Sequence, residues 1–103
     1  MKSEFLILPQ AEADISEAYL WYEARSAGLG SEFLRAVDAC LAAVGRKPLG
    51  YPVVHKEVRR ALLRKFPFAT FYAIEEERIA ILALFHGRRD PKEIERLASR
   101  NRP

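Results

Sequence analysis

The chain has 103 residues, of which half are hydrophobic and 30% are charged. This composition excludes a disordered chain and predicts one globular domain over residues 1–103. No apolar run approaches the ~20 residues that a membrane span needs, and no secretory signal is visible. The single cysteine, Cys40, excludes an internal disulfide. These features favour a cytoplasmic protein.

Charge is distributed unevenly along the chain. Residues 1–47 carry five basic and seven acidic side chains, a balance of −2, whereas residues 48–103 carry twelve and seven, a balance of +5. An electropositive second half favours an acidic peptide, a nucleic acid or a machine that handles nucleic acid as the partner.

A short strand and two amphipathic helices are predicted in the first half. Residues 3–8 read as a strand, and Pro9 suits the first turn of a helix, where a missing N–H is tolerated. The apolar stripe of this helix contains Ala11, Ile15, Ala18, Tyr19 and Tyr22, and Trp21 is expected to join the core rather than to stack on bases. Residues 28–30 end the helix, and Ser31 is expected to cap the next, whose stripe contains Leu34, Val37, Leu41 and Val44. The two helices predict an antiparallel hairpin.

Three further strands and a short helix are predicted in the second half. The strands cover residues 58–66, 68–75 and 78–86, and residues 91–98 form the helix, with Ile94 and Leu97 on one face. Alternation along the last strand places Ile79, Ile81, Ala83 and Phe85 on one face and Ala80, Leu82 and Leu84 on the other. Because both faces are apolar, this strand is predicted to be central. The order strand–helix–helix–strand–strand–strand indicates an α+β fold, with the helical hairpin packed on one face of a mainly antiparallel sheet.

A basic cluster begins the second half of the chain and contains Lys56, Arg59, Arg60, Arg64 and Lys65. On a strand, Arg60 and Arg64 would face one way and Arg59 and Lys65 the other. The cluster fits an anion-binding surface for phosphates or carboxylates. It equally fits a solvated edge strand, where basic side chains block unwanted pairing.

A second cluster, His86-Gly87-Arg88-Arg89-Asp90-Pro91, follows the last strand. His86 suits a general acid or base, because its unperturbed pKa lies near neutrality. The alternative is a strand-end histidine with a backbone hydrogen bond, with Asp90 paired to Arg88 or Arg89. One cysteine and two distant histidines argue against a zinc site, and no cofactor-binding fingerprint is present.

Several motifs, in order, resemble the ParE/RelE superfamily of toxins, and its ParE branch most closely. They are Leu8-Pro9-Gln10-Ala11-Glu12-Ala13-Asp14-Ile15 with Trp21-Tyr22, Gly28-Leu29-Gly30-Ser31-Glu32-Phe33-Leu34, Pro48-Leu49-Gly50-Tyr51-Pro52, Arg59-Arg60-Ala61-Leu62-Leu63, Phe66-Pro67-Phe68 and the closing His86–Pro91 segment. The resemblance spans about residues 3–91. It implies the toxin half of a type II toxin–antitoxin pair, which arrests growth unless its antitoxin is present.

The resemblance leaves two targets open. RelE-type members cut messenger RNA in the ribosome, and ParE-type members are described as poisoning DNA gyrase. Metal-free RNA cleavage needs an acid, a base and cations on the phosphate. RelE-type sites usually supply a tyrosine or histidine near the C-terminus, but here the last tyrosine is Tyr72, within the sheet, and nothing after residue 91 titrates near neutrality.

Gyrase inhibition without catalysis is therefore the preferred prediction, with contacts to target and antitoxin from Arg59, Arg60, Arg64, Lys65, His86, Arg88 and Arg89. The alternative is a ribosome-dependent nuclease that uses His86, Arg60, Arg64 and Arg88, or an inactive member that serves only as an antitoxin partner. The antitoxin's flexible tail is expected in the groove between hairpin and sheet, where basic side chains meet its acids.

Overall fold

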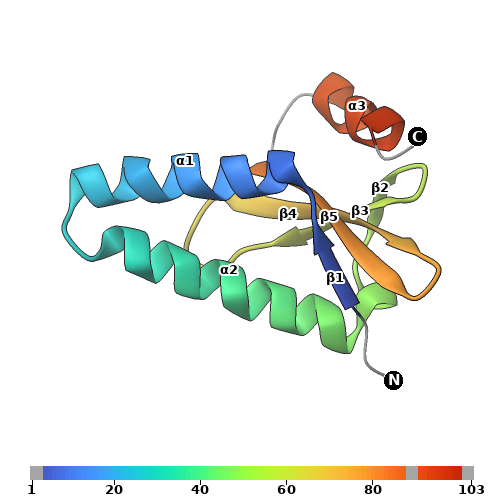
Figure 1. Ribbon diagram of the computed structural model, residues 1–103, viewed down its shortest axis with the longest axis horizontal. Helices are drawn as coiled ribbons and strands as arrows, with labels where there is room; N and C mark the ends of the chain where they lie inside the picture. The colour runs from blue at the N-terminus through green and yellow to red at the C-terminus, as the bar shows by residue number, and fades with distance from the viewer. Residues whose placement is uncertain (1–3, 88–90, 101–103) are drawn as a thin grey trace.

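The computed structural model describes residues 4–87 and 91–100. Its elements are β1 (Glu4–Ile7), α1 (Pro9–Arg25), α2 (Leu29–Arg46), a 3-10 turn η1 (Pro48–Gly50), β2 (Val53–His55), β3 (Val58–Leu62), β4 (Phe68–Glu75), β5 (Arg78–His86) and α3 (Pro91–Arg100). The strands form one sheet in the order β1-β5-β4-β3-β2, in which β1 runs parallel to β5 and the other pairs are antiparallel. The predicted α+β fold is confirmed (Figure 1). Within the described ranges no helix is long and apolar enough to cross a membrane.

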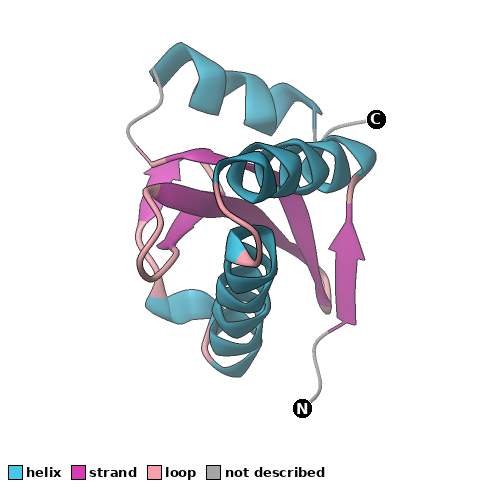
Figure 2. Cartoon of the chain, turned by 90° about the vertical axis from the view of Figure 1, so that its left-hand side faces the viewer, coloured by secondary structure: helices cyan, strands magenta, loops and turns pink. Residues whose placement is uncertain are grey.

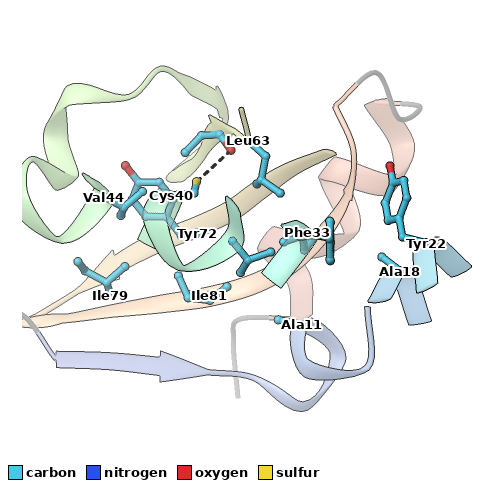
Figure 3. Close-up of a cluster of buried hydrophobic side chains, with 13 residues drawn as sticks. Ala11, Ala18, Tyr22, Phe33, Cys40, Val44, Leu63, Tyr72, Ile79 and Ile81 are labelled. Carbon is cyan, nitrogen blue, oxygen red and sulfur yellow. Dashed lines mark hydrogen bonds between the residues drawn. The ribbon is translucent and has the colours of Figure 1, made fainter. Parts of the chain in front are cut away.

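The helical hairpin packs on one face of the sheet and buries the larger part of the core. Phe33, Val37, Cys40 and Val44 of α2 meet Tyr72 of β4, Ile79 and Ile81 of β5, and Ala11, Ala18 and Tyr22 of α1 (Figure 3). The buried stripe of α2 therefore starts at Phe33, and the prediction that Leu34 begins it is wrong. Leu34 lies on the flank of the helix, one residue round from the buried face, and is exposed.

The turn between the two helices is held by a carboxylate from α1. Gly28, with φ of +90°, precedes α2, and the side chain of Glu23 accepts hydrogen bonds from the backbone N–H groups of Gly28 (3.0 Å) and Gly30 (2.9 Å). The prediction that Ser31 caps α2 is wrong, because the helix already begins at Leu29. Position 30 favours glycine for steric reasons, because a Cβ added to Gly30 would lie only 2.7 Å from Cε1 of Tyr19.

The opposite face of the sheet is covered by α3 (Figure 2). Ile94 and Leu97 are buried there against a second apolar cluster that contains Val58, Phe71, Leu82 and Phe85. The prediction of a terminal helix with Ile94 and Leu97 on its inner face is confirmed, and the helix extends to Arg100.

The strand expected over residues 58–66 is shorter than predicted, because β3 ends at Leu62. The following residues form a turn in which Lys65 has a left-handed φ of +69°. The strand β2, which has three residues and pairs with β3 through a turn at Lys56, was not predicted. Because β2 flanks β3, the basic strand β3 is not the edge of the sheet.

A β-bulge in β5 changes the faces of its last residues. Phe71 pairs with Ala83 and Tyr72 with Ile81, so Leu82 is one extra residue in β5. The predicted alternation holds up to Leu82 and is wrong beyond it: Ala83 and Phe85 face α3, and Leu84 faces the hairpin. The prediction that β5 lies inside the sheet is confirmed.

Replacing Glu23 with alanine removes the acceptor for two backbone N–H groups at the start of α2. We expect the free energy of unfolding to fall by about 1 kcal/mol. Glu23→Gln keeps an acceptor oxygen and is the matched control, with a smaller loss. Urea denaturation followed by circular dichroism measures both, and a fully stable Glu23→Ala variant would contradict the capping role.

Candidate functional site

Arg59 lies on the hairpin face of β3 and is bound to the protein itself. Its Nη1 donates hydrogen bonds to the carbonyl oxygens of Tyr51, at 2.6 Å, and Leu49, at 3.4 Å. The guanidinium therefore holds the segment that follows α2 against the sheet. Of the predicted basic residues, this one has an evident structural role.

Tyr72, opposite Arg59 in the β3–β4 register, secures the same segment. Its hydroxyl donates a 2.6 Å hydrogen bond to the carbonyl oxygen of Pro48, and its side chain is fully buried. Burial raises the pKa of Tyr72 to about 12, against the opposing effect of the Arg59 charge. The last tyrosine of the chain thus stays protonated near neutrality and does not serve as a base there.

Arg60 and His86 line one cleft of about 450 Å³ at the end of β5, together with Leu62, Leu63, Phe66, Pro67 and Gly87. Nη1 of Arg60 donates to the carbonyl oxygen of Gly87 at 3.3 Å. Nε of Arg60 is buried without a hydrogen-bond partner in the described part of the chain. A cleft lined by a guanidinium and an imidazole suits an anion such as a phosphate or a carboxylate.

Arg64 lies in a different cleft from Arg60. Its cleft of about 460 Å³ runs between α2 and the end of β3, and is lined by Ala36, Ala39, Cys40, Ala43, Arg46, Tyr51, Leu62 and Arg64. The prediction that Arg60 and Arg64 share a face of one strand is wrong, because β3 ends before Arg64. Arg46 was not predicted as a site residue, although it follows Ala36, Ala39 and Ala43 at helical spacing.

The remaining predicted basic residues are not brought into these clefts. Lys56 and Lys65 lie in exposed turns and line neither the Arg60 cleft nor the Arg64 cleft. Arg88 and Arg89 lie outside the described residues. The structure therefore unites Arg60 with His86 and separates them from Arg59 and Arg64.

A third cleft, of about 690 Å³, lies between α1 and the end of β5 and is called the α1 groove below. It is lined by Asp14, Glu17, Ala18, Leu20, Trp21, Tyr22, Pro67, Phe68, Leu84, Phe85 and His86. The expectation that Trp21 is a core residue is wrong: its side chain is 52% exposed, beneath the guanidinium of Arg25 at 3.6 Å from the ring centre. Tyr22, by contrast, is buried as predicted.

The two grooves between hairpin and sheet differ in charge. The cleft between α2 and the end of β3, called the α2 groove below, carries Arg46 and Arg64, as expected for a surface that binds acidic groups. The α1 groove instead carries the carboxylates Asp14 and Glu17, together with His86. Basic side chains therefore line the groove on the α2 side, and carboxylates line it on the α1 side.

Neither a metal cluster nor a reactive thiol stands out in the described ranges. No group of three His, Cys, Asp or Glu side chains is placed to hold a metal ion among residues 4–87 and 91–100. Cys40 is buried, and its Sγ lies 3.7 Å from the carbonyl oxygen of Ala61 and 3.6 Å from the hydroxyl of Thr70, within hydrogen-bond reach of both. Burial raises the pKa of Cys40, which keeps the unreactive thiol form.

Comparison with known proteins assigns the family. A model of the ParE toxin of the type II toxin–antitoxin system parDE matches residues 5–91. The chain belongs to this family of ParE toxins. A search of curated proteins finds no match.

Two solved structures share the fold of this ParE toxin. The chromosomal ParDE toxin–antitoxin system from P. aeruginosa is 24% identical over 82% of this chain and 96% of that chain, with a TM-score of 0.60. The toxin–antitoxin complex RelBE2 from Mycobacterium tuberculosis is 16% identical over 84% of this chain and 99% of that chain, with a TM-score of 0.57. At these identities the likeness is one of fold.

Arg59→Ala should lower the free energy of unfolding by about 1–2 kcal/mol, because it removes a charged donor from the Tyr51 carbonyl. Arg64→Ala, at an exposed position, should change it by less than about 0.5 kcal/mol. Urea titrations of both variants measure the difference. Equal losses in the two variants would contradict the structural role of Arg59.

Tyr72→Phe tests the raised pKa. Because the folded state holds the Tyr72 proton more tightly than the unfolded chain, stability present below pH ~10 is lost as the pH rises towards 12. We expect the free energy of unfolding of the wild type to fall over this range, and that of Tyr72→Phe to fall less. Tyr22, whose pKa burial also raises, remains in the variant and leaves some loss. Urea titrations at pH 8, 10 and 11 measure the slopes, and identical slopes would contradict the assignment.

Proposed function

We propose that this ParE toxin inhibits DNA gyrase by binding and without catalysis, and that a cognate antitoxin neutralises it. The observation that carries the proposal is the composition of the Arg60 cleft. Its described lining holds one imidazole, that of His86, and one guanidinium, that of Arg60, which contributes positive charge. This arrangement supports recognition of an anionic group more directly than the paired acid and base of RNA cleavage.

The position of Tyr72 supports the same proposal. A tyrosine that acts as a general base needs access to substrate and a lowered pKa, whereas Tyr72 is buried, bonded to Pro48 and raised in pKa. Arg59, beside it, is bonded to backbone carbonyls. Two groups that a nuclease site would recruit thus stabilise the fold instead.

A ribosome-dependent nuclease is the second candidate, because Arg60 and His86 do share a cleft. In that mechanism His86 transfers a proton and Arg60 stabilises charge on the scissile phosphate. The likeness to RelBE2 is compatible with this activity. The two candidates differ in what they require of His86.

Antitoxin binding is the second part of the proposal. Both similar structures are described as toxin–antitoxin systems or complexes. In this chain the α2 groove places Arg46 and Arg64 beside a floor of Ala36, Ala39 and Ala43. An acidic segment of the antitoxin would find two cations there and an apolar floor against which its own small side chains pack.

Purified toxin should inhibit the supercoiling activity of gyrase at micromolar concentration. Arg60→Gln should weaken inhibition by about ten- to a hundredfold, since a charge-assisted contact is worth about 1.5–3 kcal/mol, while His86→Asn should stay within about threefold. Arg78→Gln, at the far end of β5, is the control for a change in net charge. Melting temperatures of all variants check folding.

The nuclease candidate predicts a strict dependence on His86 as well as on Arg60. Translated messages would be cut in cells that express the toxin, and His86→Asn would abolish cutting. Unaffected supercoiling at micromolar toxin would overturn the gyrase proposal. Normal growth of cells that express soluble toxin without antitoxin would favour an inactive member.

A further inference from the structure

The α1 groove has a lining that the proposed function leaves unexplained. Leu20 and Trp21 are 65% and 52% exposed beside it, although a small protein gains by burying such side chains. Pro67 and Phe68 form the facing wall, so the deeper part of the groove is apolar. An apolar surface of this kind, rimmed by charge, is typical of a protein-binding site.

The charged rim of this groove is acidic. Glu17 is exposed on α1, and Asp14 lies one turn earlier on the same side of the helix. Asp14 already has hydrogen-bond partners within the protein. Its Oδ2 accepts a 3.0 Å hydrogen bond from the backbone N–H of Leu84, and its Oδ1 accepts one from Gln10. Its negative charge remains and adds to that of Glu17, so this end of the groove attracts a cation.

The opposite end of the groove repels a cation. The guanidinium of Arg25 lies over the indole of Trp21, one turn beyond it along α1. A bound segment is therefore oriented: its cation lies near Asp14 and Glu17, and its apolar side chain lies near Trp21 and Phe68. Four residues of helix separate Glu17 from Trp21, a rise of about 6 Å.

We propose that the α1 groove binds a second segment of the antitoxin, one that carries a lysine or arginine and a bulky apolar side chain. The inference rests on the proposed function, because it assumes an antitoxin. A 6 Å separation corresponds to about two residues of an extended segment or about four of a helical one. The antitoxin thus presents an acidic segment to Arg46 and Arg64 and a basic, apolar segment to Glu17 and Trp21.

Trp21 offers a direct measurement, because it is the only tryptophan in the chain. Burial of its exposed indole against a partner should shift its emission to shorter wavelength. The experiment titrates the full-length toxin with overlapping 15-residue synthetic peptides that cover the antitoxin encoded beside it, each tryptophan replaced by phenylalanine. We expect one peptide, with the basic and apolar residues at the stated spacing, to shift the emission and bind.

Charge reversals on the toxin then separate the two grooves. Glu17→Lys should weaken the emission-shifting peptide by about three- to tenfold, because it replaces an attraction with a repulsion. Asp38→Lys, the same charge change at an exposed position of α2 outside both grooves, should leave its affinity within twofold. Arg46→Glu with Arg64→Glu should weaken an acidic peptide and spare the basic one.

Each contrary outcome has a distinct meaning. If neither the peptides nor the intact antitoxin bind the toxin, both the antitoxin proposal and this inference fail. If the intact antitoxin binds but neither it nor any peptide shifts the Trp21 emission, the inference alone fails. It also fails if the emission-shifting peptide is acidic and insensitive to Glu17→Lys. Emission that depends on toxin concentration without any peptide would assign the groove to a second copy of the chain.

Discussion

The extra residue at Leu82 in β5 is the constraint on which the functional surface depends. Strand residues alternate between faces, so one inserted residue moves every later side chain to the other face. The bulge places Leu84 beneath α1. There the carboxylate of Asp14 accepts a hydrogen bond from the backbone N–H of Leu84, a role that a neighbouring strand would otherwise take. The bulge also carries His86 to the hairpin side, beside Phe68, where it lines two clefts at once. Without the bulge, His86 would face α3.

The fold follows from the sequence to a large extent, because its elements are marked by the spacing of apolar residues and by the prolines and glycines between them. Pro9 begins α1, Gly28 precedes α2, and the change from helical to strand period after Pro48 separates hairpin from sheet. What escaped prediction has local physical causes. The strand β2 has three residues after Pro52, too few to show a period, and a bulge leaves no mark in a run such as Ile79–Phe85 that is apolar on both faces.

The candidate site was less predictable than the fold, because a basic residue in a sequence does not reveal what it contacts. Arg59 and Arg60 are neighbours, yet one bonds the carbonyls after α2 and the other reaches the carbonyl of Gly87. Arg64 lies apart from these two arginines because the strand β3 ends at Leu62. Trp21 looked like a core residue because it adjoins the stripe that buries Tyr22, and only packing shows that the stripe stops short of it. Family resemblance supplied the fold and the class of protein, but not this division.

The wall shared by two clefts has a thermodynamic consequence. Pro67 and His86 line both the α1 groove and the Arg60 cleft. A molecule that fixes His86 in one rotamer from either side changes the free energy of binding on the other side, even where the two occupants never touch. Such coupling is reciprocal: whatever factor an inhibitor in the groove imposes on the affinity for target, the target imposes on the affinity for inhibitor. Under the proposed assignment of the two clefts, target binding would drive release of the inhibitor through linkage rather than competition.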